Sequence, residues 1–329
     1  MITVTRTSLP PLEEYVSYLE GLWQSAHLTN NGPLCCELAS RLKSHLGVAN
    51  LELMANGTLA LQLAIKSLGL RGEIITTPYS YVATTNAILW EGCDPVFVDI
   101  DARSFCIDPD LIEAAITERT TGILATHVYG YPCDVDRIQA IADRHGLKVI
   151  YDAAHAFGVN YLGHSLLEHG DCSTLSFHAT KLFHTGEGGA VVSRTAEISN
   201  RLFLQATFGH RGEDNYLDVG INAKMSELHA AMGLAVLPSV ADYIAVRRGL
   251  AELYDELIAD MPLQRPAALP GLDYNYAYYP VVFQDHESML RVRQALLGQD
   301  IVPRRYFYPS LNTLPFLRQD LRRPCPISE

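Results

Sequence analysis

The residue with the clearest chemical potential is a lysine that stands between two strand-like runs. Lys181 follows an apolar stretch that begins at Leu175 and precedes a second apolar run at residues 190–192. A lysine is costly to bury unless it is paired or chemically used. A desolvated lysine has a lowered pKa and becomes a nucleophilic amine that can form a Schiff base, whereas a surface lysine paired with Glu187 is the ordinary alternative.

An aspartate and a histidine lie at the end of another strand-like run, at residues 147–155. The run is apolar until Asp152, and an aspartate at the end of a buried strand needs a partner. It could cap a following helix or face a cationic ring nitrogen. His155 lies three residues further on and could hydrogen-bond or stack with such a ligand, although a lone histidine more often has an ordinary structural role.

A phosphate site is suggested by residues at the start of a predicted helix. Gly57 and Thr58 lie where the strand-like run 51–57 ends and the next helix begins, and there free backbone N–H groups and the helix dipole favour an anion. Ordinary helix capping is the competing interpretation. Tyr79 and Tyr81 follow the next strand-like run, where an aromatic ring can stack on a planar ligand or simply pack in the core.

The combination favours one cofactor over the separate ordinary interpretations. A phosphate site, a stacking aromatic, a buried aspartate and a reactive lysine occur in this order along one predicted sheet, with Ser176 five residues before Lys181. Pyridoxal phosphate needs these groups, because an aspartate keeps its pyridine nitrogen protonated and a lysine holds the cofactor and moves a proton.

The elements that must position these residues alternate between residues 50 and 195. Strand-like runs at 51–57, 73–78, 95–100, 122–130, 147–155 and 173–180 are separated by helical patterns, with Asp108 as an N-cap, Pro109 at a first helical position and Gly146 as a C-cap. Continuous apolar strands between amphipathic helices predict an α/β fold with a mostly parallel sheet covered on both faces. Ligands collect at the carboxyl ends of such strands.

The rest of the chain predicts three parts. These are an N-terminal segment 1–30, a large cofactor-binding domain 31–240 and a small C-terminal α+β domain 241–329. The helical pattern runs from Ser226 to Met261, and a proline-rich linker follows at 262–271. Beyond it we expect strands at 276–283 and 301–308 and a helix at 288–298.

Composition excludes several other classes of protein. The 329 residues carry a net charge of −12 with no Lys/Arg-rich run, which argues against nucleic-acid and anionic-membrane partners. No apolar run reaches about 18 residues and the N-terminus lacks a signal-peptide core, so we expect no membrane span. Seven cysteines without a C-x-x-C pair indicate reduced thiols in a cytoplasmic protein and no metal site.

The chain resembles the DegT/DnrJ/EryC1/StrS sugar-nucleotide aminotransferase family, which has the type I (aspartate aminotransferase-like) fold. The resemblance rests on the stretches "LTNNGP" (28–33), "NGTLALQLAI" (56–65), "TTPYSYVATTNAI" (76–88), "PVFVDID" (95–101), "YDAAHAFG" (151–158), "SFHATKLFHTGEGG" (176–189) and "GINAKMSELHAAMG" (220–233). They cover most of the chain in the family's order. Relatives run on for another helix and strand after "PCP", so we expect the small domain to be incomplete.

The resemblance implies a role for each residue that matches a family motif. Lys181 would carry pyridoxal phosphate, Asp152 would pair with its pyridine nitrogen, and His155 would lie near its phenolic oxygen. Tyr81 would stack on the ring. The phosphate would be held by Gly57, Thr58 and Ser176, and by Asn222 from the partner subunit of a homodimer with shared sites.

The resemblance also implies a reaction. Family members that dehydrate sugars carry histidine at the position of Lys181, so this chain resembles a true aminotransferase, closest to the VioA-type members that aminate C4. It would move an amino group from L-glutamate to a nucleotide-linked 4-keto-6-deoxy sugar, dTDP-4-dehydro-6-deoxyglucose, for O-antigen or other glycan synthesis. The alternatives are a cofactor-binding relative without turnover, a 3-aminotransferase acting on a 3-keto sugar nucleotide, and a lyase with the same fold.

Overall fold

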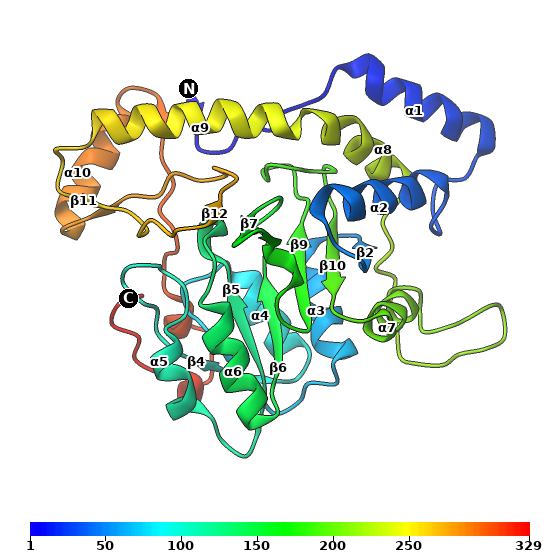
Figure 1. The fold of residues 1–329 in the computed structure, drawn as a ribbon, viewed down its shortest axis with the longest axis horizontal. Helices are drawn as coiled ribbons and strands as arrows, with labels where there is room; N and C mark the ends of the chain where they lie inside the picture. The colour runs from blue at the N-terminus through cyan, green and yellow to red at the C-terminus, as the bar shows by residue number, and fades with distance from the viewer.

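A seven-stranded sheet forms the centre of the molecule (Figure 1) in the computed structural model, which describes all residues, 1–329. Its strand order is β2-β10-β9-β6-β5-β3-β4. β10 is antiparallel to both of its neighbours, and the other pairs are parallel. The strands are β2 Leu51–Met54, β3 Glu73–Thr76, β4 Asp94–Phe97, β5 Thr120–Thr126, β6 Lys148–Asp152, β9 Cys172–Ser176 and β10 Gly189–Ser193. The mostly parallel sheet predicted from the apolar runs is therefore confirmed.

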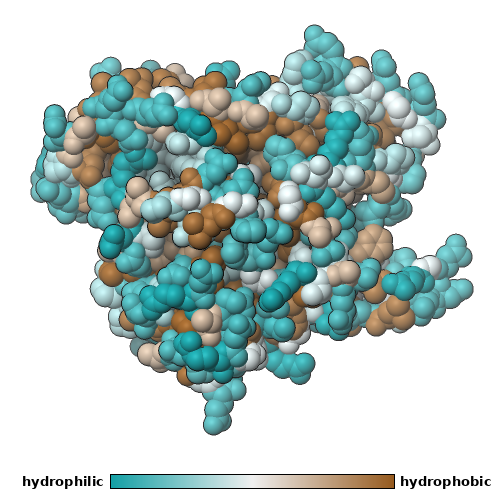
Figure 2. All heavy atoms as spheres, viewed as in Figure 1, coloured by the Kyte–Doolittle hydropathy of each residue, from teal (hydrophilic) through white to brown (hydrophobic).

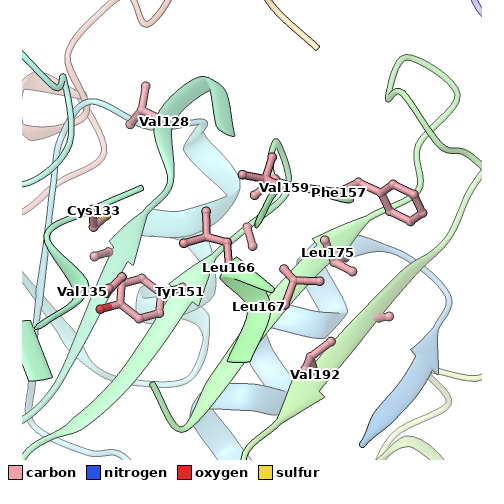
Figure 3. Close-up of a cluster of buried hydrophobic side chains, with 14 of the residues drawn as sticks. Val128, Cys133, Val135, Tyr151, Phe157, Val159, Leu166, Leu167, Leu175 and Val192 are labelled. Atoms are coloured by element: carbon pink, nitrogen blue, oxygen red, sulfur yellow. The ribbon is translucent and has the colours of Figure 1, made fainter. Parts of the chain in front are cut away.

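Both faces of the sheet are buried, because successive side chains along each strand point to opposite faces. Ile123 and Val149 belong to a core of 48 buried residues on one face, whereas Leu124 and Ile150 belong to a second core of 18 on the other. Figure 3 shows part of the larger core, where Tyr151, Leu175 and Val192 extend side chains from three neighbouring strands. This two-sided burial explains why the strands read as continuous apolar runs.

Helices cover the two faces, and their ends follow ordinary capping chemistry. Asp108 and Gly146 cap helices as predicted: Asp108 accepts the N–H of Asp110, and Gly146 has a φ of 64°. The first seven helices are α1 Leu12–Ser25, α2 Pro33–Leu46, α3 Gly57–Ser67, α4 Val82–Trp90, α5 Pro109–Ile112, α6 Val135–His145 and α7 Ala196–Ala206. α3 and α7 contribute to the smaller core, whereas α2 and α6 contribute to the larger one.

One helix end is capped by a residue far away in the sequence. α2 has Gly32 at its N-cap position, which offers no side chain. The buried carboxylate of Glu227 instead accepts the N–H groups of Leu34 (2.8 Å) and Cys35 (3.1 Å). This contact joins the "LTNNGP" segment to the "GINAKMSE" segment and satisfies orphan donors of the helix.

A long helical stretch crosses the top of the molecule in Figure 1. It consists of α8 Glu227–Val236, a 3₁₀ turn at Leu237–Ser239 and α9 Val240–Leu257. By length and composition alone this stretch could cross a membrane, but 44% of its most apolar 18-residue window is buried in the protein. A core helix of a soluble protein meets the same criteria, so this is weak evidence for a membrane span. Figure 2 shows hydrophobic surface along α9, where Val246, Leu250 and Leu257 are exposed.

The C-terminal part has less strand than its sequence predicts. The strands expected at 276–283 and 301–308 are wrong in extent, because only β13 Val282–Phe283 and β14 Ile301–Val302 form. Tyr274 and Asn275, next to the first expected strand, instead hydrogen-bond to backbone carbonyls of the loops that follow β5 and β6. The remaining elements are α10 His286–Leu297 and the short strands β1 Ile2–Thr3, β7 Asn160–Tyr161, β8 His164–Ser165, β11 Leu263–Gln264 and β12 Leu272–Asp273.

Both ends of the chain contact other parts of the protein. β1 pairs in parallel with β14. At the other end, the buried carboxylate of Asp99 accepts the N–H groups of Ile327 (2.8 Å) and Ser328 (3.0 Å), so the last residues pack just beyond the end of β4. The division into parts at residues 30 and 240 stays a prediction.

Candidate active site

The chemistry-bearing residues lie at one edge of the sheet. β6 ends on Asp152 and β9 ends on Ser176, and these two strands are parallel neighbours. Lys181 lies in the turn that connects β9 to β10. The carboxyl ends of parallel strands meet at the same edge, which explains how residues far apart in the sequence come together.

Lys181 borders a small cavity with His155. Burial lowers the pKa of Lys181 to about 8, with the Asp152 carboxylate opposing this shift and the Arg304 guanidinium adding to it. Glu187, the alternative partner, lies 3.7 Å from His178 and forms no ion pair with the lysine. Lys181 is therefore a half-buried amine at the cavity, with its pKa lowered by burial. The cavity is lined by Ala154, His155, Phe157, Thr180, Lys181, Leu182, Asn275, Ala277 and Tyr278.

Asp152 is buried and takes hydrogen bonds on both carboxylate oxygens. Oδ2 accepts the hydroxyl of Thr84 at 2.7 Å, and Oδ1 accepts the N–H of Ala154 at 3.1 Å. Burial raises the pKa of Asp152, against these two hydrogen bonds and the positive charge of Lys181. No helix begins at residue 153, so the helix-cap interpretation is wrong for this aspartate.

His155 is buried and has a fixed tautomer. Its Nδ1 accepts the N–H of Tyr129 at 3.1 Å, which places the ring proton on Nε2. Burial, and then the charge of Lys181, holds the pKa of His155 well below its ordinary value. The ring lies between aromatic neighbours, with Tyr278 at 4.4 Å and Phe307 at 6.1 Å between centroids. His155 is therefore a neutral hydrogen-bond donor beside the lysine.

Gly57 and Ser176 lie against each other, as a shared phosphate site requires. A Cβ atom added at Gly57 would meet the Ser176 Cβ at 2.8 Å. Asn56 caps α3 by accepting the N–H of Leu59 (2.9 Å), so capping occurs one residue before the predicted site. Thr58 is exposed and is the second residue of α3. The start of this helix lies beside Ser176 at the end of β9. Such a helix start favours an anion.

The two tyrosines after β3 have different environments. Tyr79 packs in the core, with its hydroxyl 2.8 Å from that of Tyr129 and donating to the carbonyl of Tyr306 (3.1 Å), so the structural interpretation is correct for it. Tyr81 precedes α4 and is 54% exposed. Its ring is free to meet a ligand.

Asn222 is not brought to the Lys181 cavity within one subunit. It forms an isolated bridge with Thr207, and its Oδ1 accepts a hydrogen bond from Lys224 at 2.7 Å. The amide nitrogen is a hydrogen-bond donor and has no partner within this subunit. The preceding loop, between α7 and α8, extends away from the body at the right of Figure 1.

Sequence reasoning missed the segment that closes the site from the C-terminal part. Asn275 is 1% exposed and donates to the carbonyls of His155 (2.9 Å) and Phe157 (3.0 Å). The Tyr274 hydroxyl donates to the carbonyl of Tyr129 at 2.7 Å. These bonds fix the loop that carries His155. They join residues more than 100 positions apart in the sequence, so no local sequence pattern indicates them.

The side chains present fit pyridoxal phosphate. The start of α3 at Gly57 packs against Ser176, so the backbone N–H groups of the helix start and the Ser176 hydroxyl are neighbours. Lys181 has a pKa lowered by burial, and Asp152 is a buried carboxyl that a protonated ring nitrogen would match. These are the groups that the phosphate, aldehyde and pyridine ends of the cofactor need.

Comparison with known sequences and solved structures gives the same fold and cofactor class. The chain is 44% identical over 311 residues to dTDP-4-amino-4,6-dideoxy-D-glucose transaminase of Shigella dysenteriae, covering 94% of this chain and 85% of the relative. A protein of the same name from Escherichia coli is 43% identical over 323 residues, covering 96% and 86%. The crystal structure of DesI in the presence of its TDP-sugar product superposes with a TM-score of 0.93 at 34% identity, covering 99% of this chain and 84% of DesI.

The predicted type I fold is thereby confirmed, and so is the predicted cofactor. NtdA of Bacillus subtilis, solved with bound PMP, has a TM-score of 0.85 at 28% identity, covering 92% of this chain and 71% of NtdA. Residues 12–329 match the DegT/DnrJ/EryC1/StrS aminotransferase family. This chain belongs to that family and is a pyridoxal-phosphate-dependent aminotransferase.

Proposed function

We propose that this enzyme moves an amino group from L-glutamate to C4 of a nucleotide-linked 4-keto-6-deoxy sugar, dTDP-4-dehydro-6-deoxyglucose. The observation that carries the proposal is Lys181, a half-buried amine beside Asp152 and His155. A lysine supports amino transfer, because it both holds the cofactor and moves a proton. The sugar and nucleotide follow the two transaminases that are 43–44% identical over most of the chain.

The side chains have distinct tasks in this proposal. Bound pyridoxal phosphate supplies an electron sink for the bonds around the amino-bearing carbon. Lys181, with a pKa of about 8, holds the cofactor and then exchanges a proton near neutral pH. Asp152 keeps the pyridine nitrogen protonated, and His155 donates from Nε2 to the phenolic oxygen. Tyr81 stacks on the ring.

The start of α3 and the end of β9 would hold the phosphate in this proposal. Gly57 lets the helix start pack against Ser176, while Thr58 and Ser176 would provide hydroxyl donors. Helix-dipole and N–H contacts at such a start suit a dianionic group.

The direct test is turnover with a panel of keto sugars. Purified protein with pyridoxal phosphate and L-glutamate is incubated with dTDP-, UDP- and GDP-linked 4-keto sugars and with 3-keto sugar nucleotides, and products are identified by mass and NMR. We expect a 4-amino sugar from the dTDP substrate. Lys181→Ala should give none, whereas Lys66→Ala, at an exposed site on α3, should behave as wild type. Amination at C3, or no amination of any substrate, would contradict the proposal.

We further propose a homodimer in which Asn222 reaches the cofactor phosphate of the partner subunit. Asn222 lies away from its own Lys181 cavity and has a free amide nitrogen. Mixing Lys181→Ala and Asn222→Ala chains under conditions that exchange subunits should partly restore activity, because one site of the heterodimer then carries neither change. A fully active Asn222→Ala chain, or an exchanged mixture without recovery, would refute the shared site.

The cellular setting is also a proposal. Seven free cysteines, six of them buried, suit a reducing cytoplasm. We propose that the amino sugar is made there for O-antigen or another glycan. Deletion of the gene should remove an amino sugar from the surface glycan, and fractionation should recover the enzyme with cytoplasmic markers.

A further inference from the structure

A chain of three hydroxyl groups ends on the Asp152 carboxylate. The Thr84 hydroxyl donates to Asp152 Oδ2 at 2.7 Å. The Ser80 hydroxyl lies 2.8 Å from that of Thr84, and the Thr126 hydroxyl donates to Ser80 at 2.9 Å. All three hydroxyl-bearing residues are buried, at 0–4% exposure. They come from the end of β5, the loop after β3 and the first turn of α4.

The direction of these hydrogen bonds follows from the carboxylate. An ionised Asp152 can only accept, so the Thr84 proton must point to it. The Thr84 oxygen is then an acceptor for Ser80, and the Ser80 oxygen is the acceptor for Thr126. Three O–H dipoles therefore point the same way, toward Oδ2, and each polarises the next.

We propose that Thr84, Ser80 and Thr126 are positioning residues that keep Asp152 ionised and assign its two oxygens. This inference rests on the proposed function, because it takes Asp152 to face the pyridine nitrogen of the cofactor. Burial favours the neutral acid, and the nearest opposing charge is Lys181, from the turn after β9. His155 is neutral and supplies no charge. The hydroxyl chain on Oδ2 and the Ala154 N–H on Oδ1 are thus the contacts that oppose protonation even when the lysine is consumed in bonding to the cofactor.

Thr85, the residue after Thr84, provides a matched control. Thr85 is also on α4 and is also 0% exposed, but its hydroxyl has no hydrogen-bond partner. Thr84→Val and Thr85→Val are therefore the same change at neighbouring buried sites. Only the first removes a donor to Asp152.

The first experiment uses cofactor-free protein, so its outcome does not depend on the proposed reaction. Aspartate labelled with ¹³C at the side-chain carboxyl is incorporated, and the Asp152 signal is assigned by its loss in Asp152→Asn. We expect Thr84→Val to raise the pKa of Asp152 by about one pH unit or more, the usual worth of a hydrogen bond to a charged group. Thr85→Val should leave it unchanged, and Thr84→Ser should restore the wild-type titration.

The second experiment uses the cofactor-loaded enzyme and its visible absorption as a function of pH. Thr84→Val should shift the titration of the absorption band and lower kcat at least about tenfold with KM for glutamate little changed, while Thr85→Val does neither. If Thr84→Val fails to fold, Ser80→Ala breaks the chain one link away and should shift both titrations in the same direction. An Asp152 titration in Thr84→Val that equals that of Thr85→Val would overturn the inference. Failure of the keto-sugar panel alone would leave the carboxyl titration standing.

Discussion

In the cofactor-free protein, Lys181→Met should raise the free energy of unfolding at neutral pH. The folded protein holds a lysine whose pKa is lowered from 10.5 to about 8, chiefly because burial penalises its charge. At about 1.4 kcal/mol per pH unit this shift corresponds to roughly 3 kcal/mol. The value is net of the attraction to Asp152, which acts in the opposite direction. Methionine has similar length and no charge to desolvate.

The sign of the pH dependence follows from proton binding. Between about pH 8 and 10.5 the unfolded chain keeps a proton on Lys181 that the folded chain has released, so wild-type stability rises with pH in this window. The advantage of Lys181→Met is therefore fully present below about pH 8 and shrinks as the pH rises toward 10.5.

Urea unfolding of both proteins at a series of pH values measures this difference. Lys66→Met, at an exposed position on α3, serves as the control and should differ from wild type by a small amount that does not vary with pH. A variant less stable than wild type at about pH 7, or a gap that stays constant up to about pH 9.5, would show that Lys181 is not held against a desolvation cost.

Three further predictions concern the residues around the lysine and the helix start. Asp152→Asn should lower kcat by well over tenfold, which corresponds to more than about 1.4 kcal/mol in the activation barrier, while pyridoxal phosphate still binds. Steady-state kinetics measure kcat, and the absorbance of the bound cofactor measures its binding. Gly57→Ala places a Cβ 2.8 Å from the Ser176 Cβ and should weaken cofactor binding at least about tenfold in a fluorescence titration, with tight binding counting against the phosphate assignment. Glu227→Ala leaves two N–H groups of α2 without an acceptor and should cost about 3 kcal/mol or more in urea unfolding, whereas the exposed Glu197→Ala should change stability by less than about 0.5 kcal/mol.

The parts of the fold that the sequence predicts well are those that depend on local periodicity. The predicted runs 147–155 and 173–180 overlap β6 and β9, which end earlier, at Asp152 and Ser176, and Asp108 and Gly146 cap their helices. Strand length in the C-terminal part is predicted poorly. Residues 276–281 have strand-like composition, but composition does not reveal that the neighbouring Asn275 hydrogen-bonds to the loop after β6 and not to a strand.

The residues of the candidate site likewise include some that the sequence indicates and others that it does not. Lys181 and His155 can be found from the sequence, because residues that follow apolar strands meet at one edge of the sheet. Thr84 cannot, because its contact with Asp152 spans 68 positions and depends on how α4 docks beside β6. Tyr79 and Tyr81 show the limit clearly: two tyrosines two residues apart have opposite environments, one packed in the core and one exposed.

The place of β2 at the edge of the sheet has a consequence during protein synthesis. Its only strand partner is β10, and Leu51 pairs with Val192, 141 positions later (192 − 51). At roughly 5–20 residues per second, a ribosome needs on the order of 7 to 30 seconds to make that partner. During this interval β2 has unpaired backbone groups and an apolar face, whereas β9 and β10 emerge almost together. The nascent chain is therefore most exposed to aggregation, and most dependent on chaperones, before residue 193 leaves the ribosome.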